Sequence, residues 1–308
     1  THGALIANLN QASNNDDLAI TSKDIALAAL PMYHIFGLHV VAGLILKAGA
    51  TLIIGRSFDA IELAHIISHS KITIVPGVPA LFDAFINTKE ITIDSLNKVR
   101  LFISGGSVLN VQTRKSFKEK FGAKIGEGYG LTEAGPMVSF QMDPKIEGDI
   151  GKTLEGIEID IRDSGGASGL INDAGQIVVR GPNIFKGYFG DSNATSRVLD
   201  SNGWLYTGDI GLRDSDGSII LLERASDVIV VDGFSVFPSE VEAVLNKCEL
   251  VNASIVVGEL NEGSGEIVIA HVELVDSLDG EVFDDVDAET IRAQRNYEKQ
   301  IRDFCIEN

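Results

Sequence analysis

Residues 126–133 combine the residue types that a nucleotide-binding site needs. They read Gly-Glu-Gly-Tyr-Gly-Leu-Thr-Glu, so three glycines alternate around a tyrosine before a hydroxyl and a carboxylate. The glycines would let a planar base approach the backbone, and Tyr129 could stack on that base. Thr132 could donate a hydrogen bond to a phosphate, and Glu133 could hold Mg²⁺. The structural alternative is a glycine-rich loop before an ordinary helix start, because the spacing matches neither a Walker loop nor a dinucleotide fingerprint.

Three further segments have side chains suited to nucleotide chemistry. Ser-Gly-Gly-Ser at residues 104–107 follows an apolar stretch, where glycines let a ring or a phosphate approach, or simply make a tight turn. Asp209 lies between two glycines and could accept both hydroxyls of a ribose, or merely stabilise its turn. Arg224 could reach the same ribose or form a surface salt bridge.

Composition excludes several classes of protein. The 308 residues carry a net charge of −19, which argues against nucleic acid or an anionic membrane surface as the main partner. A local anion site stays open, since backbone N–H groups bind phosphate without net positive charge. Two cysteines cannot form a disulfide framework, so we expect a reducing, cytoplasmic setting. The sequence leaves membrane association and oligomeric state open.

Alternating patterns predict the scaffold that positions these segments. Apolar runs indicate strands and spaced apolar residues indicate helices, in alternation, which is typical of a mostly parallel sheet covered by helices. The expected strands are residues 25–30, 50–54, 72–75, 99–104 and 123–125. The expected helices are residues 38–46, 59–70, 79–86 and 111–121.

The pattern changes twice further along the chain. Short strands separated by Gly and Asp-Gly turns, at 157–161, 176–180 and 218–222, predict a small β-subdomain. Beyond it, a small α+β domain is expected, with its strands at 228–231, 251–257 and 266–274, its helices at 238–246 and 288–306, and an acidic loop at 276–287. The predicted fold class is therefore α/β, with a partial large-domain subdomain at 1–147, the β-subdomain at 148–223 and a C-terminal domain at 224–308.

Taken in this order, the segments resemble the adenylate-forming enzymes, which include acyl-CoA synthetases, adenylation domains of peptide synthetases and firefly luciferase. The resemblance covers essentially the whole chain. Leu-Pro-Met-Tyr-His-Ile-Phe-Gly at 30–37 is similar to the family's acyl-pocket motif, and 127–133 to its adenine and Mg²⁺ motif. Residues 175–182, 186–188 and 204–211 resemble its β-subdomain signatures.

The resemblance implies roles for the residues that match those motifs. Thr132 would contact the α-phosphate, Glu133 would bind Mg²⁺, and His34 would lie by the carboxylate of the acid. Asp209 and Arg224 would bind the ribose. The residues that would border the adenine, the acyl pocket or, for the last one, the pantetheine tunnel are Gly105, Gly106, Ser107, Gly128, Tyr129, Gly130, Leu131 and Gly233.

The chain is expected to be a piece of a longer protein. It begins at Thr1, and its last residues read as an unfinished helix. The resemblance implies a Ser/Thr/Gly-rich phosphate loop upstream of Thr1 and a catalytic lysine beyond Asn308. Without both parts, the chain alone is expected to be inactive in adenylation. Ser226 stands at the hinge position, where the family usually has Asp or Lys.

The implied activity is that of an ATP-dependent acyl-CoA ligase. The protein would use ATP, Mg²⁺ and CoA. The acid would first be activated as acyl-AMP, with release of pyrophosphate, and then transferred to CoA. Two patterns, Pro-Met-Val-Ser at 136–139 and residues 229–236, are similar to fatty-acyl members and favour a fatty acid. The alternatives are acylation of a carrier protein, a luciferase-like oxygenase, and a non-catalytic nucleotide-binding relative if the chain ends are genuine.

Overall fold

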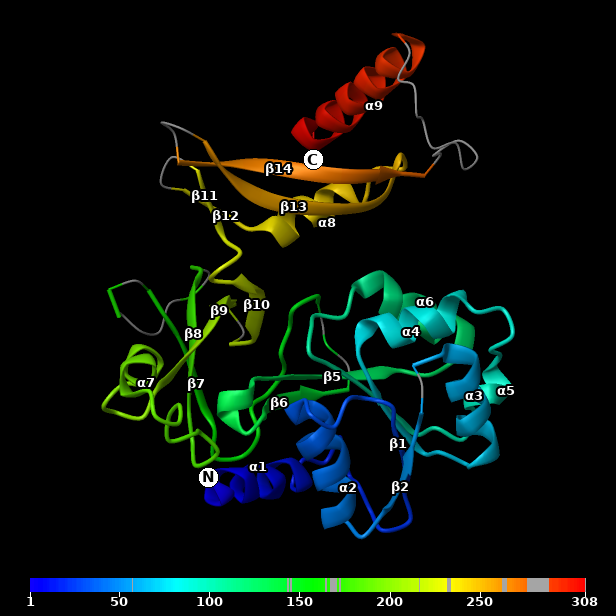
Figure 1. Ribbon diagram of the computed structural model, residues 1–308, viewed down its shortest axis with the longest axis vertical. Coiled ribbons are helices and arrows are strands. Elements are labelled where there is room, and N and C mark those ends of the chain that lie inside the picture. The colour runs from blue at the N-terminus through cyan, green and yellow to red at the C-terminus, as the bar shows by residue number, and fades with distance from the viewer. Residues whose placement is uncertain are drawn as a thin grey trace. The chain divides into compact units, whose positions relative to one another are not determined.

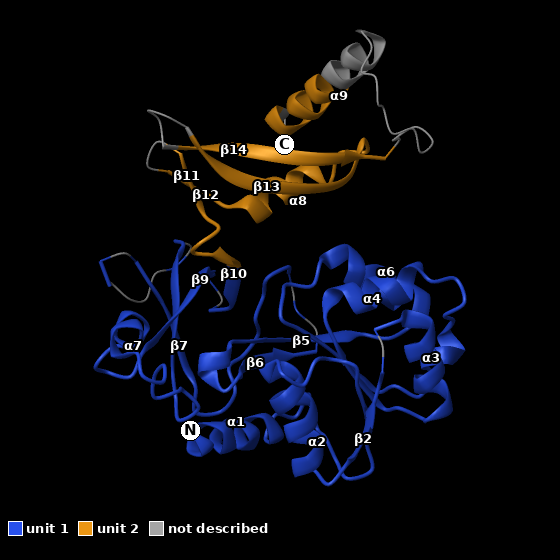
Figure 2. Ribbon diagram, viewed as in Figure 1, with its two compact units in different colours: residues 1–221 blue, residues 222–308 orange. Residues whose placement is uncertain are grey.

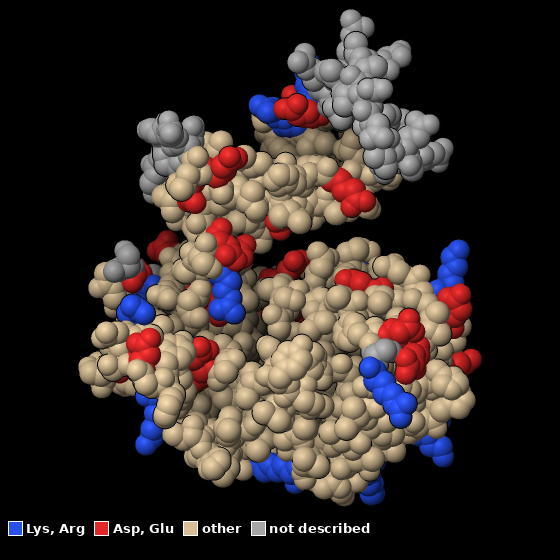
Figure 3. Space-filling model, viewed as in Figure 1, with Lys and Arg blue, Asp and Glu red and all other residues tan. Residues whose placement is uncertain are grey.

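The computed structural model describes residues 1–56, 58–142, 144, 146–163, 165–166, 171, 173–215, 217–231, 234–261, 265–275 and 288–307 (Figure 1). The chain divides into two compact units, Thr1–Leu221 and Leu222–Asn308 (Figure 2). On the face drawn in Figure 3, Lys and Arg side chains are dispersed among Asp and Glu rather than gathered in a patch.

The first unit is built on a six-stranded sheet in the order β2-β1-β3-β4-β5-β6. The first five strands are parallel, and β6 runs antiparallel to β5. This arrangement confirms the predicted mostly parallel α/β sheet. The strand bounds are β1 Ile25–Ala28, β2 Thr51–Ile54, β3 Ile74–Gly77, β4 Leu101–Gly105, β5 Ile125–Gly130 and β6 Met137–Gln141.

Helices cover both faces of this sheet. Successive residues of a strand point to opposite faces, and apolar side chains on both faces are buried. Leu27 of β1 belongs to the same buried cluster as Phe82 and Phe117, whereas its neighbour Ala26 belongs to the cluster that holds Val40 and Ile45. The helices on the first of these faces are α3 Ala60–His69, α4 Pro79–Asn87, α5 Ile93–Leu96 and α6 Val111–Phe121. The helices on the second are α1 His2–Ser13, the π-helix η1 Phe36–Gly43 and α2 Leu44–Lys47.

The glycine-rich segment continues β5 instead of leaving the sheet. The expected strand at 123–125 in fact runs to Gly130, and β6, which the sequence did not predict, pairs with it. A Cβ on Gly126 would lie 2.5 Å from Cζ of Phe140 and 2.7 Å from Sδ of Met142. Glycine is needed here because the side chains of Phe140 in β6 and of Met142 just after it lie across the backbone of β5. The helix expected at 38–46 is also different, since it is split into η1 and α2.

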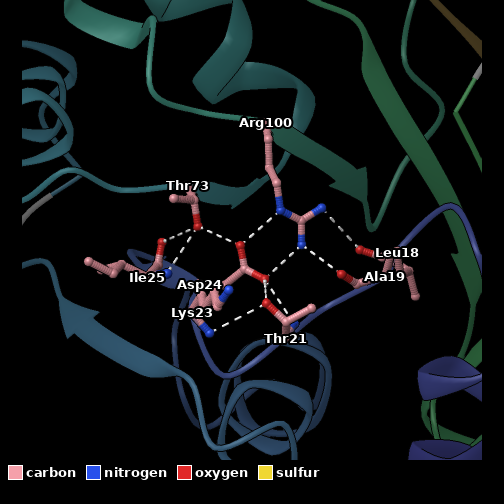
Figure 4. A network of polar contacts seen from close by, with 8 residues as sticks. All are labelled: Leu18, Ala19, Thr21, Lys23, Asp24, Ile25, Thr73 and Arg100. Atoms are coloured by element: carbon pink, nitrogen blue, oxygen red, sulfur yellow. Dashed lines mark hydrogen bonds and ion pairs between the residues drawn. The ribbon is translucent and has the colours of Figure 1, made fainter.

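A polar network fastens the amino ends of β1, β3 and β4 (Figure 4). Asp24, directly before β1, is buried and accepts hydrogen bonds from Nε and Nη2 of Arg100, each 2.8 Å long. It also accepts from the backbone N–H of Thr21 (2.8 Å) and from Oγ1 of Thr73 (2.8 Å). The Arg100 guanidinium holds the pKa of this carboxyl well below its usual range. The network lies at the edge opposite the strand ends that carry the predicted site.

The free side of β6 is covered from within the chain. Asn8 of α1 donates from Nδ2 to the carbonyl of Met137 (2.6 Å) and accepts from the N–H of Met137 (3.0 Å). The N–H of Leu154 donates to the carbonyl of Val138 (2.9 Å). Backbone groups of Met137 and Val138 on β6 therefore have partners from other parts of the chain.

The β-subdomain is a four-stranded sheet in the order β10-β9-β8-β7. Its elements are β7 Glu158–Arg162, β8 Gly175–Arg180, α7 Ser192–Val198, β9 Leu205–Arg213 and β10 Ile219–Arg224. Three of these strands match the expected short strands. The fourth, β9, covers the segment around Asp209 that the sequence indicated as a turn.

The second unit is an α+β fold, as expected. Its sheet has the order β12-β11-β14-β13, and Ile229, Leu245 and Ile301 lie in its core. The elements are β11 Ile229–Val231, β12 Phe234–Val236, α8 Pro238–Leu245, β13 Val251–Asn261, β14 Gly265–Leu274 and α9 Ala288–Glu307. The expected acidic loop at 276–287 lies outside the described residues. None of the helices in the described part of the chain is long and apolar enough to cross a membrane.

Candidate active site

The carboxyl ends of β4 and β5 bring the two glycine-rich segments together. Gly105 and Gly128 are neighbours in the parallel register of these strands. A Cβ on Gly105 would lie 3.2 Å from Cε1 of Phe36 and 3.4 Å from the carbonyl oxygen of Gly128. Phe36 starts η1 and belongs to the segment at 30–37, so three predicted segments meet at one edge of the sheet. A ligand that binds there can contact backbone directly.

His34 lies in the connection that follows β1, at the same edge. Its ring is exposed, and its Nδ1 accepts a hydrogen bond from the backbone N–H of Phe36 (3.2 Å). Gly37 is buried, and any side chain there would overlap the carbonyl of Pro31. The backbone of this turn is therefore fixed while the imidazole stays accessible to a ligand.

Asp209 meets Tyr129, and this contact joins the two sheets of the first unit. The phenol hydroxyl of Tyr129 donates to Oδ2 of Asp209 over 2.6 Å. Asp209 is only 2% exposed, and its N–H donates to Oγ1 of Thr207 (3.1 Å), which in turn donates to the carbonyl of Ile177 (2.9 Å). The residue expected to stack on adenine and one expected to bind ribose thus lie side by side.

Thr132 and Glu133 lie on a single 3-10 turn, η2 Thr132–Ala134, one residue after β5. Glu133 is held from the β-subdomain, because the Tyr188 hydroxyl donates to its Oε1 (2.8 Å). The N–H of Phe185 donates to the Glu133 carbonyl (2.8 Å). Sequence reasoning assigned Tyr188 to a signature at 186–188 without giving it a role.

The Glu133 carboxylate fits a magnesium ion held mainly by a nucleotide. Mg²⁺ usually keeps several waters and takes one or two carboxylates plus substrate phosphates. Glu133 is half-buried, with the Thr132 hydroxyl exposed beside it. Among the described residues, no cluster of three or more His, Cys, Asp or Glu could hold a metal by itself. A carboxylate with an exposed hydroxyl beside it is a donor set that fits a nucleotide-bound cation.

A half-buried ion pair supports the strand from its other side, and the sequence analysis did not single it out. Glu127 of β5 pairs with Arg114 of α6 and accepts from the N–H of Leu109 (3.4 Å). Burial raises the pKa of Glu127, an effect that the Arg114 charge opposes. Because Leu109 follows the segment at 104–107, this carboxylate ties β5 to the connection after β4.

The remaining predicted residues lie in connections beside the site, in the second unit or outside the described residues. Gly106 and Ser107 follow β4, and Gly106 has a φ of +89°, which favours glycine. Leu131 connects β5 to η2, and its N–H donates to the carbonyl of Pro136 (3.0 Å). Arg224 ends β10 in the second unit and is exposed. Gly233 lies outside the described residues.

Comparisons with known proteins give a consistent picture. The model of a family described as AMP-binding enzyme matches residues 1–189. The 4-coumarate–CoA ligase 2 of Nicotiana tabacum is 36% identical over 282 residues, which cover 88% of this chain and 52% of that protein. The 4-coumarate–CoA ligase 1 of Petroselinum crispum is 34% identical over the same shares. The chain spans about half the length of these curated relatives.

Solved structures agree in fold. ATP-bound MatB from Rhodopseudomonas palustris superposes with a TM-score of 0.82 at 30% identity, over 88% of this chain and 54% of that one. The o-succinylbenzoate CoA synthetase MenE from Bacillus subtilis, in complex with its acyl-adenylate intermediate, has a TM-score of 0.82 at 26% identity. That match covers all of this chain and 59% of MenE.

Proposed function

Because this chain belongs to the AMP-binding enzyme family, we propose that the protein it comes from is an ATP-dependent acid–thiol ligase. The protein would activate a carboxylic acid as acyl-AMP and then form the CoA thioester. The observation that carries the proposal is the meeting of Tyr129, Asp209 and the Thr132–Glu133 turn at the carboxyl edge of the sheet. Residues proposed for adenine, ribose and phosphate come there from separate elements.

Each proposed role follows from local geometry and chemistry. Gly128 and Gly130, with Tyr129 and Leu131, would border the adenine, and the Asp209 carboxylate would accept from the ribose hydroxyls. The Thr132 hydroxyl would donate to the α-phosphate. Glu133 would hold Mg²⁺, which neutralises phosphate charge when bound. Gly105, Gly106 and Ser107 would border the acyl pocket and the adenine.

The first step joins a carboxylate oxygen to the α-phosphorus and breaks the bond to pyrophosphate. In the second step a thiol attacks the acyl carbon, and AMP leaves with the bonding electrons. A carboxylate is a poor electrophile, which is why the acid is first activated. In that first step an anionic carboxylate attacks a negatively charged phosphate, so most of the catalysis is positioning and charge neutralisation. His34 would lie beside the acid, while Arg224 and Gly233 would act from the second unit.

Two classes of carboxylic acid are candidates for the substrate. The patterns at 136–139 and 229–236 favour a fatty acid, whereas the relatives are named for 4-coumarate and the MenE structure for o-succinylbenzoate. Aromatic acids are therefore as important as fatty acids in a first screen.

The test is acid-dependent exchange of labelled pyrophosphate into ATP, measured with the full-length protein. A panel should pair hydroxycinnamic and benzoic acids with fatty acids of graded length. Exchange with one acid class, followed by AMP release only when CoA is added, supports the proposal. If AMP is released with a holo carrier protein and not with CoA, the acyl acceptor is the carrier protein. Light or peroxide formation would indicate an oxygenase. ATP binding without exchange for any acid would favour the non-catalytic relative.

A further inference from the structure

We propose that residues 183–188 form a strap that positions the Thr132–Glu133 turn, with the Tyr188 hydroxyl orienting the Glu133 carboxylate. This inference rests on the proposed function, since it concerns the carboxylate that would hold Mg²⁺. It gives a positioning role to a segment of the β-subdomain that contributes none of the nucleotide contacts proposed above.

Three hydrogen bonds connect the strap to consecutive residues of the turn. Nδ2 of Asn183 donates to the carbonyl of Ala134 (2.6 Å), and the N–H of Phe185 donates to the carbonyl of Glu133 (2.8 Å). The Tyr188 hydroxyl donates to Oε1 of Glu133 (2.8 Å). Both the backbone and the side chain of Glu133 are therefore fixed by the same short segment.

The strap is itself held in shape. Asn183 is fully buried, and the rings of Phe185 and Tyr188 meet edge to face with centroids 5.0 Å apart. The N–H of Tyr188 donates to Oγ1 of Thr195 in α7 (2.9 Å). A side chain on Gly187 would lie 2.5 Å from Cγ2 of Thr195, and its φ is +131°. The phenol is thus presented from a supported backbone.

One carboxylate oxygen is occupied by the phenol, which fixes the rotation of the carboxylate. A carboxylate has acceptor sites on both oxygens, so Oε2 can face a cation while Oε1 keeps its hydrogen bond. Without the hydroxyl, Glu133 would have to order its side chain when the cation binds. Loss of the hydroxyl should therefore weaken the binding of Mg²⁺ by Glu133. A higher Mg²⁺ concentration would then be needed for ATP to bind.

The test compares Tyr188→Phe with Tyr206→Phe in the full-length protein. Tyr206 lies in the same β-subdomain and its variant also loses one hydrogen bond, the one that the hydroxyl accepts from Nη1 of Arg162 (2.9 Å) on β7, not on η2. Calorimetry measures ATP binding with and without Mg²⁺. Tyr188→Phe should raise the Mg²⁺ concentration needed for half-maximal ATP binding roughly fivefold, the size expected for one hydrogen bond. Its Mg²⁺-free ATP affinity should match that of Tyr206→Phe.

Glu133→Gln serves as the second background. There, the added Tyr188→Phe change should no longer alter the Mg²⁺ requirement, because the oriented charge is already gone. An equal Mg²⁺ shift with and without Glu133 would overturn the positioning role, and so would a Tyr188→Phe protein that binds Mg²⁺ and ATP like wild type.

Hydrogen exchange of the ligand-free protein separates this inference from the proposed function. Tyr188→Phe should speed exchange of the Phe185 amide roughly fivefold over the rate in Tyr206→Phe, because the strap loses one of its attachments to the turn. If the wild-type protein binds no ATP, the proposed function fails, and the exchange result alone decides the strap. Unchanged exchange in Tyr188→Phe refutes the strap even in an active enzyme.

Discussion

Replacing Asp24 by Asn should strongly destabilise the first unit. The carboxylate is 4% exposed and accepts hydrogen bonds from Arg100, Thr21 and Thr73. An Asn side chain presents one acceptor oxygen and turns an NH₂ group toward donors, so the Arg100 guanidinium loses its bidentate partner. The connected strand ends of β1, β3 and β4 lose their common anchor.

The magnitude follows from the burial of the two partners. Breaking a buried ion pair by removing one charge costs about 3–5 kcal/mol. The Arg100 side chain is 39% exposed, so water can recover part of its solvation. We therefore expect a loss of about 2–4 kcal/mol in the free energy of unfolding. The assay is urea denaturation followed by fluorescence of Trp204, the single tryptophan, which lies in the first unit.

Two comparisons make this prediction refutable. Glu158→Gln removes another bidentate partner of an arginine, Arg180, but at an exposed site, so its midpoint should stay at the wild-type value. The pH dependence provides the second. The pKa of Asp24 is depressed in the folded protein, so its contribution is present above the unfolded value near 3.8 and disappears as pH falls below it. Equal midpoints for Asp24→Asn and Glu158→Gln at pH 7, or a wild-type advantage over Asp24→Asn that does not shrink below about pH 4, would refute the reasoning.

Three further changes probe the site and its supports. Gly130→Ala should lower thermal stability by about 2 kcal/mol or more, because its Cβ would overlap the backbone carbonyl of Pro136; an unchanged melting temperature contradicts this. Burial lowers the pKa of His39 below its ordinary 6.5 in the folded protein, so the free energy of unfolding should fall as pH drops below 6.5. His39→Gln should therefore flatten the pH profile of urea midpoints between pH 7 and 5. Tyr129→Phe should cost about 1–2 kcal/mol of unfolding free energy, since it leaves the buried Asp209 without a 2.6 Å hydrogen bond, and a neutral result would show that the contact contributes nothing.

The large-domain scaffold could be predicted because its strands are buried on both faces. Such strands read as continuous apolar runs, and the runs at 25–30 and 99–104 contain β1 and much of β4. The helix over 111–121 has the predicted bounds, with Asn110 before it and Gly122 after it as caps. Local patterns fixed these elements, so one sequence was enough.

The strand over residues 126–130 was missed because it depends on pairing with another segment, β6. The glycines of β5 indicate a loop when read locally, but they are a strand because Phe140 of β6 packs over them. Of the candidate site, the nucleotide motifs and Asp209 could be located, whereas the Tyr129–Asp209 and Tyr188–Glu133 contacts join residues 80 and 55 positions apart. No spacing rule reaches so far.

The side chain of Asn8 has a consequence for how copies of this protein meet. An outermost strand of a sheet normally presents unpaired N–H and C=O groups, which another molecule can extend into an intermolecular sheet. Along β6 the amide of Asn8 occupies both backbone groups of Met137, and Leu154 occupies the carbonyl of Val138. A single carboxamide thus imitates one residue of a neighbouring strand and ends the ladder there. At this edge the fold is protected against aggregation by strand addition.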